Sequence, residues 1–107
     1  MPNNYKNAKV DLTTTNVTTL YTAPAATTSL VKSILASEDS GNADTITVTI
    51  TDADAAVFSL FKVKAVAANT TVELLSETLV VKENEILKVT AATANRLHVV
   101  ASLLEIS

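Results

Sequence analysis

The fold class of this chain follows from one stretch, Asp44-Thr45-Ile46-Thr47-Val48-Thr49-Ile50-Thr51. Apolar and polar residues alternate at every step, so Ile46, Val48 and Ile50 share one side of an extended chain and the threonines share the other. Such alternation is typical of an antiparallel strand with one face on a core and the other in water. Thr, Val and Ile are also frequent elsewhere, and their branched β-carbons favour a pleated sheet.

Further strands are predicted on both sides of this stretch, separated by turn-like breaks. One break, residues 38–42, contains the single glycine of the chain, Gly41. We therefore expect an all-β fold, an antiparallel β-sandwich of about eight strands with a jelly-roll-like topology. The predicted strands are residues 10–14, 17–22, 29–37, 57–67, 72–75, 79–82, 86–91 and 97–106, with 72–75 and 79–82 forming one bent strand or two.

The core and a surplus of apolar surface are predicted from the same pattern. Residues 57–67 are apolar on both sides of the strand, so alternation alone does not decide between Phe58 and Phe61, and Phe58 is the residue we place in the core. Residues 97–106 are also apolar on both sides, and surplus apolar surface on a small domain usually marks an interface. The predicted core consists of Ile46, Val48, Ile50, Phe58, Leu60, Val89 and Val99.

The chain is predicted to be one domain with an N-terminal arm. Its 107 residues suffice for a single core, which we place in residues 13–107. Residues 1–12 show no clear period and are predicted to be extended. They form either an arm that orders against a neighbouring subunit or a frayed terminus. The interface residues predicted for the arm are Tyr5, Lys6, Lys9 and Val10.

Charge and cysteine content argue against several partners. The net charge is −3 and the pI is near 4.9, whereas nucleic-acid binding needs a basic face, so no direct nucleic-acid partner is expected. There is no cysteine and His98 is the only histidine, so neither a metal nor another cofactor is expected. The absence of cysteine favours assembly in a reducing cytoplasm. The polar N-terminus and the absence of a long apolar run predict neither a signal peptide nor a membrane partner.

No catalytic motif is recognisable in the sequence. A chain with one glycine cannot form a glycine-rich phosphate loop or a Gly-x-Ser-x-Gly elbow. His98 lies within a predicted strand and is interpreted as a surface or structural residue. Asp52 and Asp54 are interpreted as turn residues, and the alternative is a small hydrolase that uses them as an acid pair. We expect no enzymatic activity.

Three segments carry a resemblance to a known group of proteins. They are residues 19–34 (TLYTAPAATTSLVKSI), 83–89 (ENEILKV) and 97–106 (LHVVASLLEI). Together with the alternating strand they resemble small virion proteins of tailed bacteriophages, which carry a similar LYTAPA-TTS-VKSI stretch near their start. The resemblance covers most of residues 17–107. The chain departs from it at Ala26 and Asn84, where glycine is common.

The resemblance implies a non-enzymatic structural component of a bacteriophage virion, assembled in the host cytoplasm. The role we favour is a capsid decoration or cement protein that stabilises the head by bridging major capsid subunits. The alternatives are a neck, collar, tail or baseplate protein, and a small carbohydrate- or host-binding β module. The implied partners are copies of the chain itself, as a homotrimer or a higher ring, and the major capsid protein or other virion proteins. The trimer rests on family analogy alone.

Overall fold

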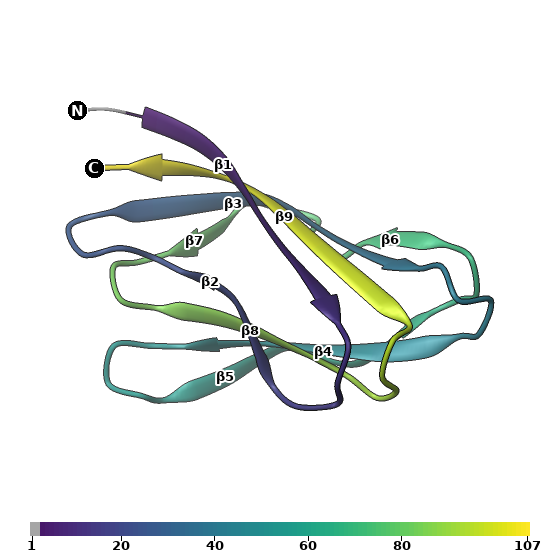
Figure 1. The fold of residues 1–107 in the computed structure, drawn as a ribbon. Helices are drawn as coiled ribbons and strands as arrows, with labels where there is room; N and C mark the ends of the chain where they lie inside the picture. Colours follow the sequence, from purple (N-terminus) through teal and green to yellow (C-terminus); the bar gives the residue numbers. More distant parts are fainter. Residues whose placement is uncertain (1–2) are drawn as a thin grey trace.

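Nine strands make up most of residues 3–107, the part of the chain that the computed structural model describes. They form two antiparallel sheets, seen as an upper and a lower layer in Figure 1. The predicted all-β sandwich is therefore confirmed. The strands are β1 (Asn3–Leu12), β2 (Thr18–Thr22), β3 (Thr28–Glu38), β4 (Asp44–Thr51), β5 (Val57–Val66), β6 (Thr71–Glu73), β7 (Leu79–Val81), β8 (Ile86–Ala91) and β9 (Leu97–Ile106).

The strand order is that of a jelly roll. One sheet has the order β1-β9-β3, with β6 and β7 both pairing with the far edge of β3, and we call it the first sheet. The second sheet has the order β2-β8-β4-β5. The chain crosses between the sheets at most connections, as in a jelly roll. There are nine strands because the segment that pairs with the far edge of β3 forms two strands, β6 and β7. The sequence had left open whether residues 72–82 form one bent strand or two.

Side-chain alternation places the core between the sheets. Ile46, Val48, Val89 and Val99 are fully buried, as predicted, and Ile50 and Leu60 pack against the core while partly exposed. Thr45, Thr47 and Thr49 alternate with these residues and are partly exposed, so they point away from the core, whereas Thr51 at the strand end is buried. The strand that decides the fold class therefore also sets the inner face of the second sheet.

The placement of Phe58 in the core is wrong. Its side chain is 54% exposed, whereas Phe61 packs against the core. In the register Phe58 is opposite Ile50 and Phe61 is opposite Val48, so Leu60 is an extra residue and both phenylalanines lie on the inner side of the sheet. β5 is also the last strand of its sheet, so its side chains have a neighbouring strand on one side only.

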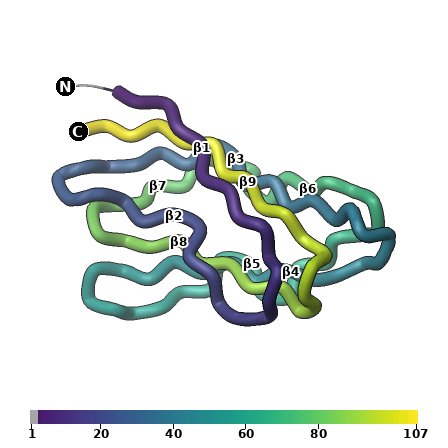
Figure 2. Tube along the Cα trace, in the orientation of Figure 1, coloured from purple at the N-terminus to yellow at the C-terminus, as the bar shows by residue number. Residues whose placement is uncertain are grey.

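The N-terminal segment is extended, as expected, but it is a strand of the sandwich rather than a separate arm. β1 pairs with β9 along its whole length, from Asn3 opposite Ile106 to Leu12 opposite Leu97. Figure 2 shows the two terminal strands running side by side. Leu12 is buried, which anchors the strand to the core. Residues 1 and 2 of the predicted arm lie outside the described residues.

Candidate functional site

The four predicted interface residues all lie on β1, but on two different faces of the first sheet. Val10 packs against the core, and Lys6 is opposite buried Leu103, so these two residues belong to the inner face. Tyr5 and Lys9 alternate with them and point outward, and Tyr5 is 77% exposed. Only Tyr5 and Lys9 can therefore contribute to a surface on the outer face.

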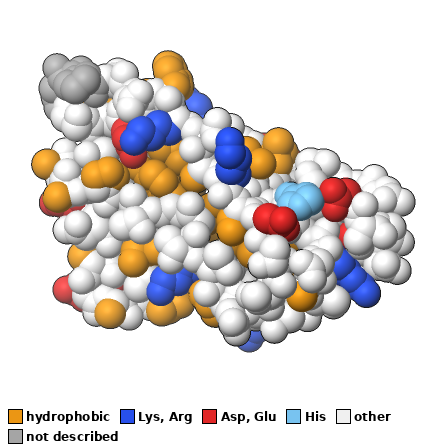
Figure 3. Space-filling view, in the orientation of Figure 1, with side chains coloured by type: hydrophobic (Ala, Val, Ile, Leu, Met, Phe, Trp, Pro, Cys, Tyr) orange, Lys and Arg blue, Asp and Glu red, His pale blue; other side chains and the backbone are white. Residues whose placement is uncertain are grey.

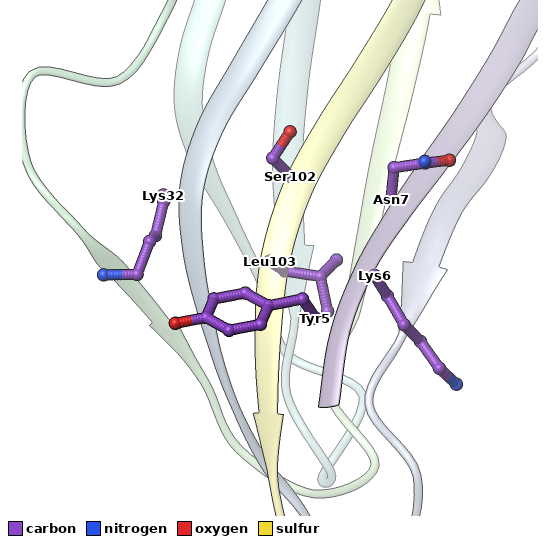
Figure 4. Close-up of a pocket in the computed structure, with 6 residues that line it drawn as sticks. All are labelled: Tyr5, Lys6, Asn7, Lys32, Ser102 and Leu103. Carbon is purple, nitrogen blue, oxygen red and sulfur yellow. The ribbon is translucent and has the colours of Figure 1, made fainter. Parts of the chain in front are cut away.

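Tyr5 lies on the outer face of the first sheet. Figure 4 shows its ring crossing β9 toward β3, where Lys32 extends, while Lys6 points to the other side of β1. The residues around the ring form a shallow hollow of about 340 Å³. Its lining contains no acidic residue. The lining residues are Tyr5, Lys6, Asn7, Lys32, Ser102 and Leu103.

The strand register shows that apolar residues cross the outer face in a continuous row. Tyr5 is opposite Leu104, Leu104 is opposite Leu30, and Leu30 is opposite Val80, so the row spans β1, β9, β3 and β7. Leu104 is only 9% exposed, yet it does not belong to the core between the sheets. We call Tyr5, Leu104, Leu30 and Val80 the apolar row.

A second outward row runs parallel to the apolar row. Lys9 is opposite Val100, Val100 is opposite Leu35, and Leu35 is opposite Glu73. Lys9 and Glu73 thus lie at opposite edges of the sheet, with two apolar residues between them. We call Lys9, Val100, Leu35 and Glu73 the mixed row. A third row, Asp11, His98, Ser37 and Thr71, is polar throughout.

Glu73 at the end of the mixed row is held as an anion. Burial raises the pKa of its carboxyl, but hydrogen bonds from the Ser33 hydroxyl and from backbone N–H groups outweigh burial and lower it. Its Oε2 accepts from the N–H of Ile34 at 2.9 Å and of Leu75 at 3.2 Å. The Ser33 hydroxyl donates to its Oε1. The carboxylate therefore accepts hydrogen bonds from backbone N–H groups that strand pairing leaves free between β6 and β7.

A buried carboxylate, Glu105, joins the two sheets near the chain ends. The Tyr21 hydroxyl of β2 donates to Glu105 Oε2 at 2.5 Å and lies 2.6 Å from Ser29 Oγ. Lys6 Nζ lies 3.1 Å from Glu105 Oε1. The hydrogen bond from Tyr21, opposed by burial, and the neighbouring Lys6 lower the pKa of Glu105. Burial and the Glu105 hydrogen bond raise the pKa of Tyr21 to about 12.

His98 lies on the polar row between two carboxylates. Its Nε2 is 3.2 Å from Asp11 and its Nδ1 is 3.4 Å from Asp39. Figure 3 shows the histidine with an acidic side chain on each side. Because the two carboxylates face different ring nitrogens, they cannot share one metal ion with the imidazole. No cluster of three or more His, Asp or Glu side chains within residues 3–107 has a metal-binding arrangement.

The acid pair considered for hydrolysis forms a turn. Oδ1 of Asp52 accepts hydrogen bonds from the N–H groups of Asp54 and Ala56, each at 2.9 Å, and closes the loop between β4 and β5. Asp54 is exposed. The geometry thus gives Asp52 the ordinary role of an aspartate that caps a turn.

Comparison with known proteins leaves the family undefined. The chain matches no protein-family model and has no significant match among curated proteins. The described residues also contain no helix long and apolar enough to cross a membrane.

Sequence reasoning found Tyr5 and Lys9 but missed the two rows they belong to. The apolar surplus of residues 97–106 was visible in the sequence. The partners of these residues were not, because a row depends on the register of four strands that are far apart in sequence. Glu105 and Tyr21 were missed for the same reason, since 84 residues separate them.

Proposed function

We propose that this protein is a non-enzymatic structural component of a bacteriophage virion, acting as a capsid decoration or cement protein that bridges major capsid subunits. The observation that carries the proposal is the apolar row. Tyr5 and Val80 expose 77% and 48% of their surface on the outer face of a sandwich whose core is already complete. A contiguous apolar surface of this kind is suited to binding other proteins.

The turns of the fold support the phage resemblance. Ala26 and Asn84, which replace glycines common in the resembling proteins, have φ angles of 58° and 64°. Both positions therefore keep the left-handed conformation that glycine adopts most easily. The segments that carry the resemblance also bind each other: the Asn84 N–H donates to the Ala23 carbonyl at 2.9 Å, and the Ala26 N–H donates to Glu83 at 2.7 Å.

A non-enzymatic role is supported by the surroundings of the chemically capable side chains. The imidazole nitrogens of His98 both face carboxylates, and Asp52 is engaged in its turn. The expected outcome of ester and glycan hydrolysis assays on the purified protein is no turnover. Hydrolysis that disappears in the Asp52→Ala variant would refute this part of the proposal.

The cement role is tested by the number of copies in a purified virion. A protein that bridges major capsid subunits must be present in hundreds of copies, because the capsid surface repeats its sites and weak contacts add through avidity. Quantitative mass spectrometry of virions measures this number. About a dozen copies would instead identify a neck, collar or tail protein, and absence from virions would refute a structural role altogether.

A carbohydrate-binding module is a second candidate, favoured by one observation. The exposed ring of Tyr5 lies on the sheet surface among Asn7, Lys32 and Ser102, which offer hydrogen-bonding groups to a sugar. A single aromatic ring provides less stacking surface than such modules usually present. Binding on a glycan array that is lost in Tyr5→Ser would establish this function in place of the first.

A further inference from the structure

The outer face of the first sheet carries a pattern that repeats from one edge of the sheet to the other. The apolar row has Tyr5 at the β1 edge and Val80 at the β7 edge. The mixed row has a cation, Lys9, at the β1 edge and an anion, Glu73, at the β6 edge. Between these two rows lie the polar Asn7, Ser102 and Ser33 and the exposed Lys32. A surface with opposite charges at its two edges can complement itself.

We propose that a second copy of this chain docks face to face on this surface, about a twofold axis that runs along the strands. The inference goes beyond the proposed function and develops the self-association expected from the sequence. Such an axis keeps each row opposite the same row but reverses the order of the strands. Tyr5 then faces the partner's Val80, and Leu104 faces the partner's Leu30. The apolar rows of the two copies thus cover each other.

The mixed row explains the choice of axis. Under the same rotation Lys9 faces the partner's Glu73, and Val100 faces the partner's Leu35, so two ion pairs form at the rim. A twofold axis across the strands would instead place Lys9 over the partner's Tyr5 and Glu73 over the partner's Val80. Both charges would then be covered without an opposite charge, which is costly. Complementary charges at a rim also select one orientation of docking.

The size of the face is sufficient for a stable dimer. Four strands about 4.8 Å apart and about nine residues long, at about 3.4 Å per residue, cover about 600 Å² per copy. Two copies would bury about 1,200 Å², which is the lower end of the range for specific interfaces. The assembly inferred here has an even number of copies, in contrast to the trimer that family analogy suggests.

Two substitutions test the interface, each with a matched control. Val80→Asp buries a charge in the apolar row, and Lys9→Glu sets like charges against the partner's Glu73, so each is expected to weaken dimerisation about tenfold or more. The controls are Val17→Asp, at an exposed loop valine, and Lys88→Glu, on the outer face of the other sheet, and neither should change it. Sedimentation equilibrium gives the dissociation constants, and urea unfolding at low concentration verifies that each variant is folded.

Crosslinking tests the orientation, because the chain contains no cysteine. Tyr5→Cys and Val80→Cys chains are mixed and treated with a bismaleimide whose reach matches the ~10 Å spacing of packed sheets. The mixture should give a crosslinked dimer, whereas each variant alone should not. Val17→Cys mixed with Val80→Cys is the control pair, and it should remain uncrosslinked.

The outcomes separate this inference from the proposed function. A monomeric wild-type protein at the highest attainable concentration, a trimer unaffected by Val80→Asp, or crosslinking of Tyr5→Cys alone would overturn the twofold interface. A monomer present in hundreds of copies per virion would overturn the interface and leave the cement role standing. A dimer with the expected crosslinks that is absent from virions would support the interface and refute the role.

Discussion

The outer faces of the two sheets each carry a row of paired residues that crosses four strands, and the two rows differ in polarity. On the second sheet the row consists of Thr19, Lys88, Thr49 and Ser59, paired in register across β2, β8, β4 and β5. On the first sheet the apolar row, which lies near the chain ends, consists of Tyr5, Leu104, Leu30 and Val80. Both rows cross four strands and point away from the same core. One is polar at every position and the other is apolar at every position.

The comparison shows that the apolar row is not a requirement of the strands themselves. Threonine has a high strand propensity because of its branched β-carbon, and the second sheet uses it where side chains face water. The first sheet could have done the same. An apolar row in that position adds nothing to the core between the sheets, which supports the proposal that it is covered by another protein surface.

The largest expected effect comes from truncating the centre of the apolar row. Leu104 is 9% exposed on an outer face, so Leu104→Ala removes packing against its neighbours and should cost about 2 kcal/mol, the low end for buried leucines. The matched change on the other face, Thr49→Ala, should cost less than about 1 kcal/mol, since it alters strand propensity alone. Urea unfolding at one low protein concentration measures both.

Equal losses for Leu104→Ala and Thr49→Ala would contradict the difference inferred between the two outer faces. They would show that the apolar row is not packed within a single chain and that the two outer faces are energetically alike. A loss for Leu104→Ala that grows with protein concentration would instead enlarge this difference, because the apolar row would then also contribute to self-association.

The sequence predicted the inner face of β4 better than the inner faces of β5 and β9, for a physical reason. In β4 one face is apolar and the other polar, so alternation alone identifies Ile46 and Val48 as core residues. In residues 57–67 and 97–106 both faces are apolar, and alternation cannot assign the inner one. The bulge at Leu60 places Phe61 as well as Phe58 on the inner side, and Phe58, near the end of an edge strand, stays exposed.

The candidate site was predictable only in part. Exposed Tyr5 and Lys9 stand out in the polar N-terminal segment, but nothing in the sequence shows that this segment pairs with residues 97–106. An edge strand and a free arm have the same local pattern. What distinguishes an edge strand from a free arm here is Leu12, which is buried between the sheets in the folded chain.

Acid is expected to destabilise the fold through carboxyl groups of the first sheet. Within residues 3–107 the three carboxyl groups with a lowered pKa are Glu38, Glu73 and Glu105, and all lie on strands of the first sheet. For Glu38, burial raises the pKa, but hydrogen bonds from the Ser40 side chain and N–H and from the N–H groups of Asn69 and Gly41 outweigh it. They lower the pKa from 4.5 to about 2.

A carboxyl whose pKa is lower in the folded state stabilises the fold above its unfolded pKa. The contribution of Glu38 should therefore be complete above about pH 4.5 and should disappear as the pH falls toward about 2. Glu38→Gln should lower the free energy of unfolding at pH 7 and flatten its dependence on pH in this window. Exposed Glu77 provides the control, and Glu77→Gln should leave the pH profile, measured by urea unfolding, unchanged.

The smallest expected effect concerns the turn that carries the chain from the second sheet to the first. Ala26 has a φ of 58°, where a β-carbon is strained by about 1–2 kcal/mol, and glycine relieves this strain. Glycine also gives the unfolded chain more freedom, which costs about 0.4–1 kcal/mol, so Ala26→Gly should stabilise the fold by about 0.5 kcal/mol. The neighbouring Ala25 is not among the residues with positive φ, so Ala25→Gly incurs the entropic cost without the relief and should be destabilising. Opposite signs for two identical changes at adjacent positions, measured by urea unfolding, would establish that the backbone conformation typical of glycine is kept at Ala26. Destabilisation by both would show that Ala26 is unstrained, and would remove the turn geometry from the argument for the phage resemblance.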